Sequence, residues 1–392
     1  MDNIRALLIT NANIVLPDRL IEDGWIYSCN GEIVAYGNSN ESYNELIGEE
    51  AQKVDGKGGY VLPGFIDIHV HGGANHDFMT AKDEELDTIT RFHMENGTTT
   101  MLATTVTASR DELTEVIDTV AKYERKPMPY AQLIGVHLEG PFVNPKWKGA
   151  QNDNFMVAPQ LEWLDEWVQK YPGVVKIQTL APEIEGAPQY IRALKDHGIV
   201  AACGHTDATF EEIEFAVEHG LSHAVHTFNA MRALHHREPG TVGAVMLNDN
   251  ITAEVIADGH HVHPAAIKIL LQAKGADLVV LVTDAMSAAG MPDGEYLLGV
   301  LPVIVEDGTA RLKEGGSLAG STLTMIKGFQ YLIQEVGVSI IEASRIASLN
   351  PARVIGISQQ YGSLEVGKRA DLLLVDKGLS IDAVFIAGEQ TL

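Results

Sequence analysis

The chain has 392 residues, a length that favours one large domain together with a smaller one. Hydrophobic residues make up 45% of it and charged residues 21%, a composition typical of a soluble globular protein. The 53 acidic residues outnumber the 28 basic ones and give a net charge of −25, which argues against nucleic acid or an anionic membrane as a partner.

The start of the chain shows no export signal. The opening sequence MDNIRALLIT has an acid directly after the first methionine and lacks a long apolar stretch before a small-residue cleavage site. No segment has the ~18 uninterrupted apolar residues that crossing a bilayer requires. The two cysteines, Cys29 and Cys203, offer no disulfide framework. We therefore expect a cytoplasmic protein.

Short strands broken by turns are expected at both ends of the chain. Residues 1–60 contain apolar runs such as NIVL and GEIVAYG, separated by Asn, Asp and Gly. A similar texture returns in YGSLEVGKRADLLLVDKG near the C-terminus. We predict that residues 1–60 and 355–392 together build a small β-sandwich domain, with a second domain of residues 61–354 inserted between them.

Strand-like and helix-like runs alternate through the middle of the chain. In the second helical run, for example, Leu113, Val116, Ile117 and Val120 recur at helical spacing. We count eight strand–helix units, of which the sixth leads into a long loop and the eighth contains an insert with a hairpin turn at EDGT. Eight such units predict an α/β protein with a (β/α)8 TIM-like barrel. The expected strands cover residues 65–70, 98–105, 133–139, 174–180, 199–205, 222–228, 251–257 and 277–284.

Histidines and acids lie at the C-terminal ends of several expected strands. His69 and His71 close the first strand, in GFIDIHVHG, and side chains two apart in a strand point the same way. In a (β/α)8 barrel the catalytic residues lie at this end of the strands. We therefore expect four imidazoles and two carboxylates to converge at the barrel mouth. The remaining members close the third, fifth, sixth and eighth strands and are Glu139, His205, His226 and Asp284.

Four imidazoles with two carboxylates are typical of a metal site. Nitrogen and oxygen ligands without a thiolate suit Zn²⁺ or Fe²⁺. Six groups exceed one tetrahedral shell, so we expect two divalent ions per subunit, bridged by Glu139. Such an ion lowers the pKa of its bound water from 15.7 to roughly 7 and yields a hydroxide nucleophile. Asp284 can then act as general base toward the water and as general acid toward the leaving group.

Each of these residues also has a structural interpretation. A single histidine at a strand end usually serves as a hydrogen-bonded structural residue, and an acid there often caps the next helix. The convergence of six such residues favours a metal site over separate structural roles. The strand–helix pattern predicts which residues lie at the barrel mouth without using the histidines. His93 and His219 lie within helical stretches and are expected to be structural, and Cys203 is expected to be a small core hydrophobe.

These segments resemble the amidohydrolase superfamily and, more narrowly, the family of N-acetylglucosamine-6-phosphate deacetylases. The resemblance covers essentially the whole chain, and HLEGPF combined with HTFNAM is its most specific part. It rests on PGFIDIHVH (63–71), HLEGPF (137–142), KGAQ (148–151), GHTDA (204–208), HTFNAM (226–231), DGHHVHP (258–264), VTDAM (282–286), LAGS (318–321) and GSLEVGKRADLLLVD (362–376).

The resemblance implies deacetylation of N-acetyl-D-glucosamine 6-phosphate to D-glucosamine 6-phosphate and acetate. It also implies a homodimer in which a neighbouring subunit supplies the residue that matches His261. The metal ligands would be Glu139, His205 and His226 for one ion and His69 and His71 for the other, with Asp284 as the acid/base. Contacts to the sugar and its phosphate would come from Ala150, Asn229, Ala230, Arg237, His261, Leu318, Ala319 and Gly320.

Two of the substrate-binding candidates are Gln151 and Arg237. Gln151 departs from the family pattern, because many relatives carry a histidine there that is thought to polarise the acetyl carbonyl. The amide of Gln151 can donate a hydrogen bond, more weakly than an imidazolium, and we assign it a substrate-binding role. Arg237 offers two parallel donors to a phosphate, although a loop salt bridge with Glu238 is the alternative.

Three other functions fit parts of the sequence. A cyclic amidase of the dihydroorotase or hydantoinase kind usually bridges its metals with a carboxylated lysine at a strand end, where this chain has Glu139. An N-acetylgalactosamine-6-phosphate deacetylase differs only in the orientation of one substrate hydroxyl. A non-catalytic protein of the same fold would be expected to have lost metal ligands, and none is missing. We therefore predict a metal-dependent deacetylase of a phosphorylated amino sugar.

Overall fold

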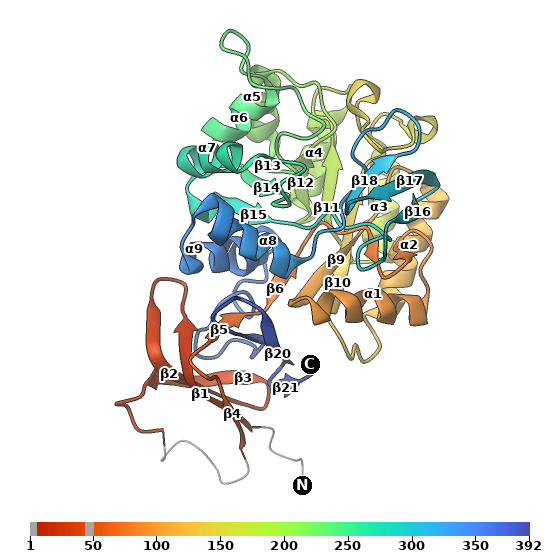
Figure 1. Ribbon diagram of the computed structural model, residues 1–392. Helices are drawn as coiled ribbons and strands as arrows, with labels where there is room; N and C mark the ends of the chain where they lie inside the picture. Colours follow the sequence, from red (N-terminus) through yellow and green to blue (C-terminus); the bar gives the residue numbers. More distant parts are fainter. Residues whose placement is uncertain (1–5, 44–50) are drawn as a thin grey trace.

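Residues 6–43 and 51–392 are described by the computed structural model, which places a barrel above a smaller sheet (Figure 1). The predicted (β/α)8 barrel and the small β domain built from both chain ends are confirmed. Residues 1–5, which begin the segment searched for an export signal, lie outside the described part. Within the described part, no helix has both the length and the apolar character needed to span a bilayer.

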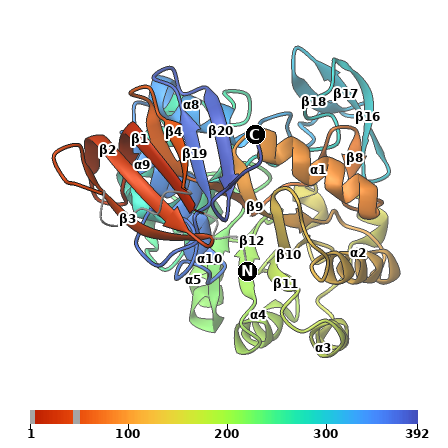
Figure 2. The ribbon, with the colours of Figure 1, turned by 90° about the horizontal axis from the view of Figure 1, so that it is seen from below.

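Strands from both chain ends form one hydrogen-bonded sheet. Its order is β3 (Glu32–Asn38), β2 (Leu20–Cys29), β1 (Ala6–Val15), β5 (Tyr60–Pro63), β19 (Leu372–Val375), β20 (Ile381–Ile386) and β21 (Glu389–Gln390), with β4 (Gln52–Asp55) paired to β1. β5 joins the two ends, because it runs parallel to β1 and antiparallel to β19. Figure 2 shows red β1 and β2 on the same side of the molecule as blue β19 and β20.

The small sheet has a hydrophobic core of its own. Ile9, Leu372 and Phe385 are buried together there, although they come from opposite ends of the chain. β5 belongs to this sheet and directly precedes the first barrel strand, so the chain crosses from one domain to the other near residue 64. The division into residues 1–60 plus 355–392 and 61–354 stays a prediction.

Eight parallel strands form the barrel in chain order, each paired with the next. All seven residues of the second strand, TTTMLAT, are buried. A strand that is buried on both faces favours a continuous run of apolar and β-branched residues, and this is the pattern seen in the sequence. A backbone bond from Asp284 N to His69 O, 2.8 Å long, connects the segments that follow the first and last strands. The strands are β6 (Phe65–Asp67), β9 (Thr98–Thr104), β10 (Gln132–Glu139), β11 (Val175–Leu180), β12 (Val200–Cys203), β13 (Leu221–Ala224), β14 (Thr252–Val255) and β15 (Val279–Leu281).

Helices surround the barrel (Figures 1 and 2), and their buried apolar residues belong to the same hydrophobic core as residues of the barrel strands. The second one shows how the sequence specifies them: Ser109 caps it in a capping box with Glu112, and the predicted apolar positions of its inner face are buried. The helices are α1 (Asp83–Glu95), α2 (Arg110–Tyr123), α3 (Leu161–Lys170), α4 (Ala187–Asp196), α5 (Phe210–His219), α6 (Gly240–Leu247), α7 (Pro264–Lys274), α8 (Met325–Tyr331), α9 (Ile340–Ser344) and α10 (Asn350–Val354).

Helix α6 lies where the sequence pattern indicated only a long loop, so that expectation was wrong for residues 240–247. The segment GTVGAVML has no polar face, and its first six residues are all buried. A helix that is apolar on all sides shows no amphipathic periodicity, and its two glycines lower its intrinsic helix propensity. Packing against neighbouring α5 and α7, not a sequence pattern, therefore stabilises α6.

Shorter elements complete the fold. The predicted hairpin turn at EDGT is confirmed, because it connects the second and third strands of an antiparallel sheet that follows the last barrel strand. That sheet consists of β16 (Gly294–Leu298), β17 (Leu301–Glu306) and β18 (Thr309–Leu312). The other short elements are β7 (Gly72–Gly73), β8 (His76–Asp77), the 3₁₀ turns at Pro145–Trp147, Asp153–Phe155 and Ala276–Leu278, and the π-helical turns at Leu332–Val336 and Arg345–Leu349.

Candidate active site

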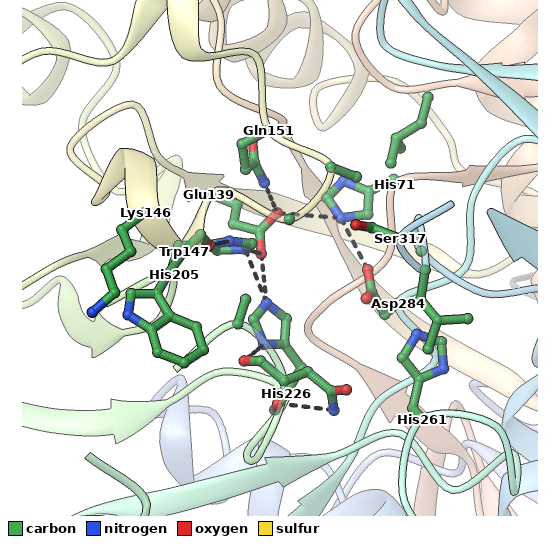
Figure 3. Close-up of a pocket in the computed structure, with 17 residues that line it drawn as sticks. His71, Glu139, Lys146, Trp147, Gln151, His205, His226, His261, Asp284 and Ser317 are labelled. Atoms are coloured by element: carbon green, nitrogen blue, oxygen red, sulfur yellow. Dashed lines mark hydrogen bonds and ion pairs between the residues drawn. The ribbon is translucent and has the colours of Figure 1, made fainter. Parts of the chain in front are cut away.

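Side chains from five barrel strands meet at the C-terminal mouth of the barrel, and Figure 3 shows most of them around one cavity. Glu139 is the last residue of β10, whereas the other members lie just beyond their strands. His205, His226 and Asp284 have positive φ angles of 48°, 29° and 51°. Such left-handed residues are strained by about 1–3 kcal/mol each and cluster at functional sites. The backbone thus turns sharply where it presents these side chains.

Glu139 lies at the centre of the cluster. Its Oε1 is 3.1 Å from Nε2 of His205 and 3.0 Å from Nε2 of His226. The same oxygen is 3.4 Å from Nε2 of His69, which lies beneath it. One carboxylate oxygen therefore faces three imidazole nitrogens that belong to three different strands.

Asp284 lies on the other side of the cluster, next to the paired histidines of the first strand. Its Oδ1 is 3.1 Å from Nε2 of His71 and 3.7 Å from Nε2 of His69. His71 Nε2 also lies 3.5 Å from the second oxygen of Glu139. Three overlapping groups of possible ligands among the described residues share His69: one with Glu139 and His226, one with His71 and Asp284, and one beneath them with His137 and Glu254.

Hydrogen bonds at the far side of each ring orient the four imidazoles. In every ring Nδ1 lies within 3.2 Å of an oxygen outside the cluster, so Nδ1 carries the proton and Nε2 presents its lone pair to the centre. The acceptors are Glu254 Oε2 for His69, the carbonyl of Thr104 for His71, the carbonyl of Trp147 for His205 and the carbonyl of Asn229 for His226.

This arrangement fits a divalent cation. Nε2 of His69 is buried and has no hydrogen-bond partner among the described residues. Nε2 of His205 and Nε2 of His226 lie only 3.2 Å apart, and with Nδ1 protonated neither can donate to the other. The Nε2 lone pairs and the Glu139 carboxylate therefore face one another with no hydrogen-bond donor from the described residues between them. A positive ion would stabilise such an arrangement. The nitrogen and oxygen donors suit Zn²⁺ or Fe²⁺.

The two carboxylates of the cluster are ionised. Burial favours the neutral form of Glu139, but positive charge at the neighbouring His69 and His205 outweighs it and holds the pKa of Glu139 well below its usual value; a cation bound by the Nε2 lone pairs would supply this charge in place of ring protons. Burial likewise opposes ionisation of Asp284, but positive charge at the adjacent His71, as a proton or a bound cation, lowers the pKa of Asp284. Both groups therefore offer negative oxygens to a cation near neutral pH.

Glu254 is a functional candidate that the sequence analysis missed. It is fully buried on β14, and its Oε2 accepts from Nδ1 of His69 and, at 3.0 Å, from the backbone N–H of His226. Its Oε1 lies 2.9 Å from Nε2 of His223, which was also missed. One signal was present in the sequence: a charged residue at the centre of the apolar strand ITAEVIA. A buried carboxylate needs partners, and here they are a metal-ligand candidate and its neighbours.

Several other histidines have structural roles. Burial lowers the pKa of His137 to about 3, and this neutral ring bonds to the carbonyl of Ile68 and to Thr179. His93 lies on the buried face of α1, as expected, and donates from Nε2 to the carbonyl of Gly72. His219 bonds to the carbonyl of Phe215 within its own helix. Cys203 is a buried member of the core, as predicted.

A cavity of about 400 Å³ opens above the cluster, within the range of about 300–1,000 Å³ that small-molecule sites occupy. Its wall includes Trp147 and Lys146, which the sequence analysis did not select for the site (Figure 3). Three predicted site residues are not in the wall: His69 lies beneath it, Ala319 is buried among apolar side chains, and Arg237 is elsewhere. The predicted residues that line the cavity are His71, Glu139, Ala150, Gln151, His205, His226, Asn229, Ala230, His261, Asp284, Leu318 and Gly320.

His261 reaches the cavity of its own chain (Figure 3). Asp258 orients it, since Oδ2 of Asp258 lies 2.7 Å from Nδ1 of His261. The expectation that a neighbouring subunit supplies this residue was therefore wrong, because α7 and the loop before it bring the side chain to the mouth within one chain. Arg237 instead lies on an exposed loop, where its Nη1 is 2.8 Å from Nε2 of His236.

Comparisons with known proteins agree with this geometry. The Amidohydrolase family model matches residues 60–391. An N-acetylglucosamine-6-phosphate deacetylase of Bacillus subtilis is 38% identical over 96% of this chain and 94% of its own length. An N-acetylgalactosamine-6-phosphate deacetylase of Escherichia coli O157:H7 is 39% identical over 84% of this chain and 87% of its own.

Solved structures show the same relationship. A mutant N-acetyl-D-glucosamine-6-phosphate deacetylase from Mycobacterium smegmatis, in complex with N-acetyl-D-glucosamine-6-phosphate, superposes with a TM-score of 0.92 and 34% identity, covering 99% of this chain and all of that one. The deacetylase from Thermotoga maritima has a TM-score of 0.88, also at 34% identity, and covers 98% of this chain and 99% of its own. The chain therefore belongs to the amidohydrolase family and, within it, to the N-acetylglucosamine-6-phosphate deacetylase family.

Proposed function

We propose that this enzyme hydrolyses N-acetyl-D-glucosamine 6-phosphate to D-glucosamine 6-phosphate and acetate. The observation that carries the proposal is the convergence of Glu139, His205, His226 and Asp284 on the floor of one cavity, in a chain 38% identical to a deacetylase of this specificity. The reaction adds water to the acetyl carbon and breaks the C–N bond, so it needs an electrophilic carbonyl and a protonated amine.

Asp284 would move the proton in this reaction. Its carboxylate is ionised at neutral pH and faces the cavity beside His71, so it can accept a proton from the attacking water and return it to the departing nitrogen. The backbone bond from Asp284 N to His69 O, 2.8 Å long, helps to keep this residue in place. A divalent cation at the histidine cluster would polarise the carbonyl and acidify the water.

We propose two ions per subunit, Zn²⁺ or Fe²⁺. Glu139, His205 and His226 would bind the first, and His69, His71 and Asp284 would serve the second. The position of Glu139 between the two groups supports this, since its Oε1 lies 3.1 Å from His205 and 3.0 Å from His226 while its Oε2 lies 3.5 Å from His71. The ionised Glu139 offers both oxygens and can bridge them.

Substrate recognition would use the cavity wall and, for the phosphate, a positive group. Lys146 is the one lysine or arginine among the described residues that line the cavity. Because Arg237 lies outside that wall, it could meet a phosphate only through movement of its loop or from a second copy of the chain. We propose that the enzyme is a cytoplasmic homodimer and retain Arg237 as the phosphate ligand. The other proposed contacts are Ala150, the backbone at Asn229 and Ala230, His261, and the segment Leu318, Ala319 and Gly320.

An acetate-release assay on the purified enzyme tests the function. We expect turnover of N-acetylglucosamine 6-phosphate, a lower kcat/KM for unphosphorylated N-acetylglucosamine, and none for a cyclic amide such as dihydroorotate. A higher kcat/KM for N-acetylgalactosamine 6-phosphate would reassign the substrate, an alternative supported by the 39% identical relative with that activity.

Metal analysis of the same preparation separates an enzyme from a non-catalytic protein of the same fold. We expect close to two equivalents of zinc or iron per chain after purification without chelators. Protein that binds neither metal and releases no acetate from any N-acetylhexosamine would contradict the proposed function.

A further inference from the structure

Gln151 is buried in the loop after β10, and both ends of its amide are hydrogen-bonded to the protein. Its Oε1 accepts from the backbone N–H of Thr107 at 2.6 Å. Its Nε2 lies 2.5 Å from Oε2 of Glu139, and only 5% of its surface is exposed. Figure 3 shows the amide above Glu139, on the side away from His226. The side chain therefore bridges the end of β9 and the end of β10.

The Thr107 contact fixes which end of the amide faces Glu139. A backbone N–H can only donate, so the atom that it meets must be the amide oxygen. The amide nitrogen then necessarily faces the carboxylate, and an N–H bond to an ionised oxygen is a strong, charge-assisted one. This bond, 2.5 Å long, determines which way the carboxylate plane of Glu139 is turned.

We propose that Gln151 is a positioning residue for Glu139, and not the group that polarises the acetyl carbonyl. By occupying Oε2, it turns Oε1 toward the two imidazoles, 3.1 Å from His205 and 3.0 Å from His226, where the first ion of the proposed function would bind. Gln151 thereby increases the affinity of the protein for that ion. The inference rests on the proposed metal site and specifies which residue orients its carboxylate.

The alternative role makes a different demand on the same amide. A side chain that donates to a substrate carbonyl would affect substrate binding and turnover but not the retention of metal. A side chain that orients a ligand affects metal affinity, typically by 10–100-fold when it is removed. Metal affinity measured without substrate therefore separates the two roles.

The test compares Gln151→Leu and Gln151→Asn with Gln160→Leu as the matched control. Gln160 is a half-buried glutamine nine positions later, and its Nε2 bonds only to the carbonyl of Ala158 among the described residues. Each holoprotein is dialysed against zinc buffered by a series of chelator concentrations, and its zinc content is measured. We expect roughly 10–100-fold weaker binding of the first zinc equivalent in both Gln151 variants and no change in the control.

Kinetics at saturating zinc complete the experiment. KM for N-acetylglucosamine 6-phosphate should then stay within about threefold of the wild-type value in the Gln151 variants. Wild-type zinc affinity in Gln151→Leu together with a raised KM or a lowered kcat would overturn the proposal in favour of a substrate contact. The asparagine variant, too short to reach both partners, gives the same answer if the leucine variant fails to fold.

The outcome is independent of the substrate assignment. If the wild-type protein binds zinc but releases no acetate from phosphorylated sugars, the proposed function fails while the zinc affinities still decide the role of Gln151. If it releases acetate and the zinc affinities of all variants are equal, the positioning role fails alone.

Discussion

Oδ1 of Asp284 lies 3.1 Å from Nε2 of His71, so the residues that follow the last and the first barrel strands meet directly in the active site. A backbone hydrogen bond connects the same two segments, since Asp284 N donates to His69 O at 2.8 Å. The contacts that connect the first and last barrel segments are therefore also contacts within the active site. Changes to either residue can be designed to alter the chemistry while the backbone bond is kept.

Asp284→Asn should keep the metal and lose most of the turnover. The amide retains the size of the carboxylate and one oxygen that can face the second ion, but it cannot accept a proton and return it, and such proton transfer contributes about 10²–10⁴-fold to rate. Acetate release and zinc content are measured on the same sample, with exposed Asp196→Asn on α4 as the control. A kcat near the wild-type value would show that another group transfers the proton.

Glu254→Gln should weaken zinc binding although Glu254 touches no proposed metal directly. The carboxylate accepts from His69 Nδ1 at 2.8 Å and thereby fixes the ring with Nε2 toward the centre. Loss of such a partner typically costs about 10–100-fold in metal affinity. Zinc affinity in chelator buffers measures the effect, and exposed Glu218→Gln on α5 provides the control. Equal affinities would mean that packing alone orients His69.

Arg237→Ala should raise KM for N-acetylglucosamine 6-phosphate by about 10–100-fold, the effect of losing one or two charge-assisted hydrogen bonds. KM for unphosphorylated N-acetylglucosamine should not change. Lys146→Ala provides the comparison, because Lys146 lines the cavity of its own chain and bonds to Asp207 at 2.8 Å. If only the lysine variant loses the preference for the phosphorylated sugar, Lys146 and not Arg237 binds the phosphate.

His93 should make the protein less stable as the pH falls from 7 to 5. Burial lowers the pKa of folded His93 to about 4, whereas an unfolded histidine titrates near 6.5. Between these two pKa values His93 is protonated in the unfolded chain and neutral in the folded chain, so falling pH favours unfolding. His93→Gln removes this contribution. Between pH 7 and pH 5 its free energy of unfolding should therefore fall by about 2 kcal/mol less than that of the wild-type protein. Urea unfolding of both proteins at each pH measures the difference, and parallel pH curves would refute the assignment.

The ligand positions could be predicted from the sequence because a parallel barrel places the C-terminal ends of all its strands at one rim. His205 and His226 are recognisable as strand-end residues without knowledge of their neighbours, and alternating apolar strands and amphipathic helices indicate the barrel. Helix α6 could not be predicted, because burial on every side removes the polar face that identifies a helix in a sequence.

What the sequence determined by itself is therefore the architecture and the set of residues that converge on the mouth. Only the tertiary structure decided which of them touch, and through which atoms. His69 and Glu254 are 185 residues apart in the chain, and no local pattern connects them. The same holds for Gln151 with Thr107, and for the presence of His261 in the cavity of its own chain. Periodicity reports which way a side chain points along its own element, whereas a hydrogen bond depends on how separate elements pack.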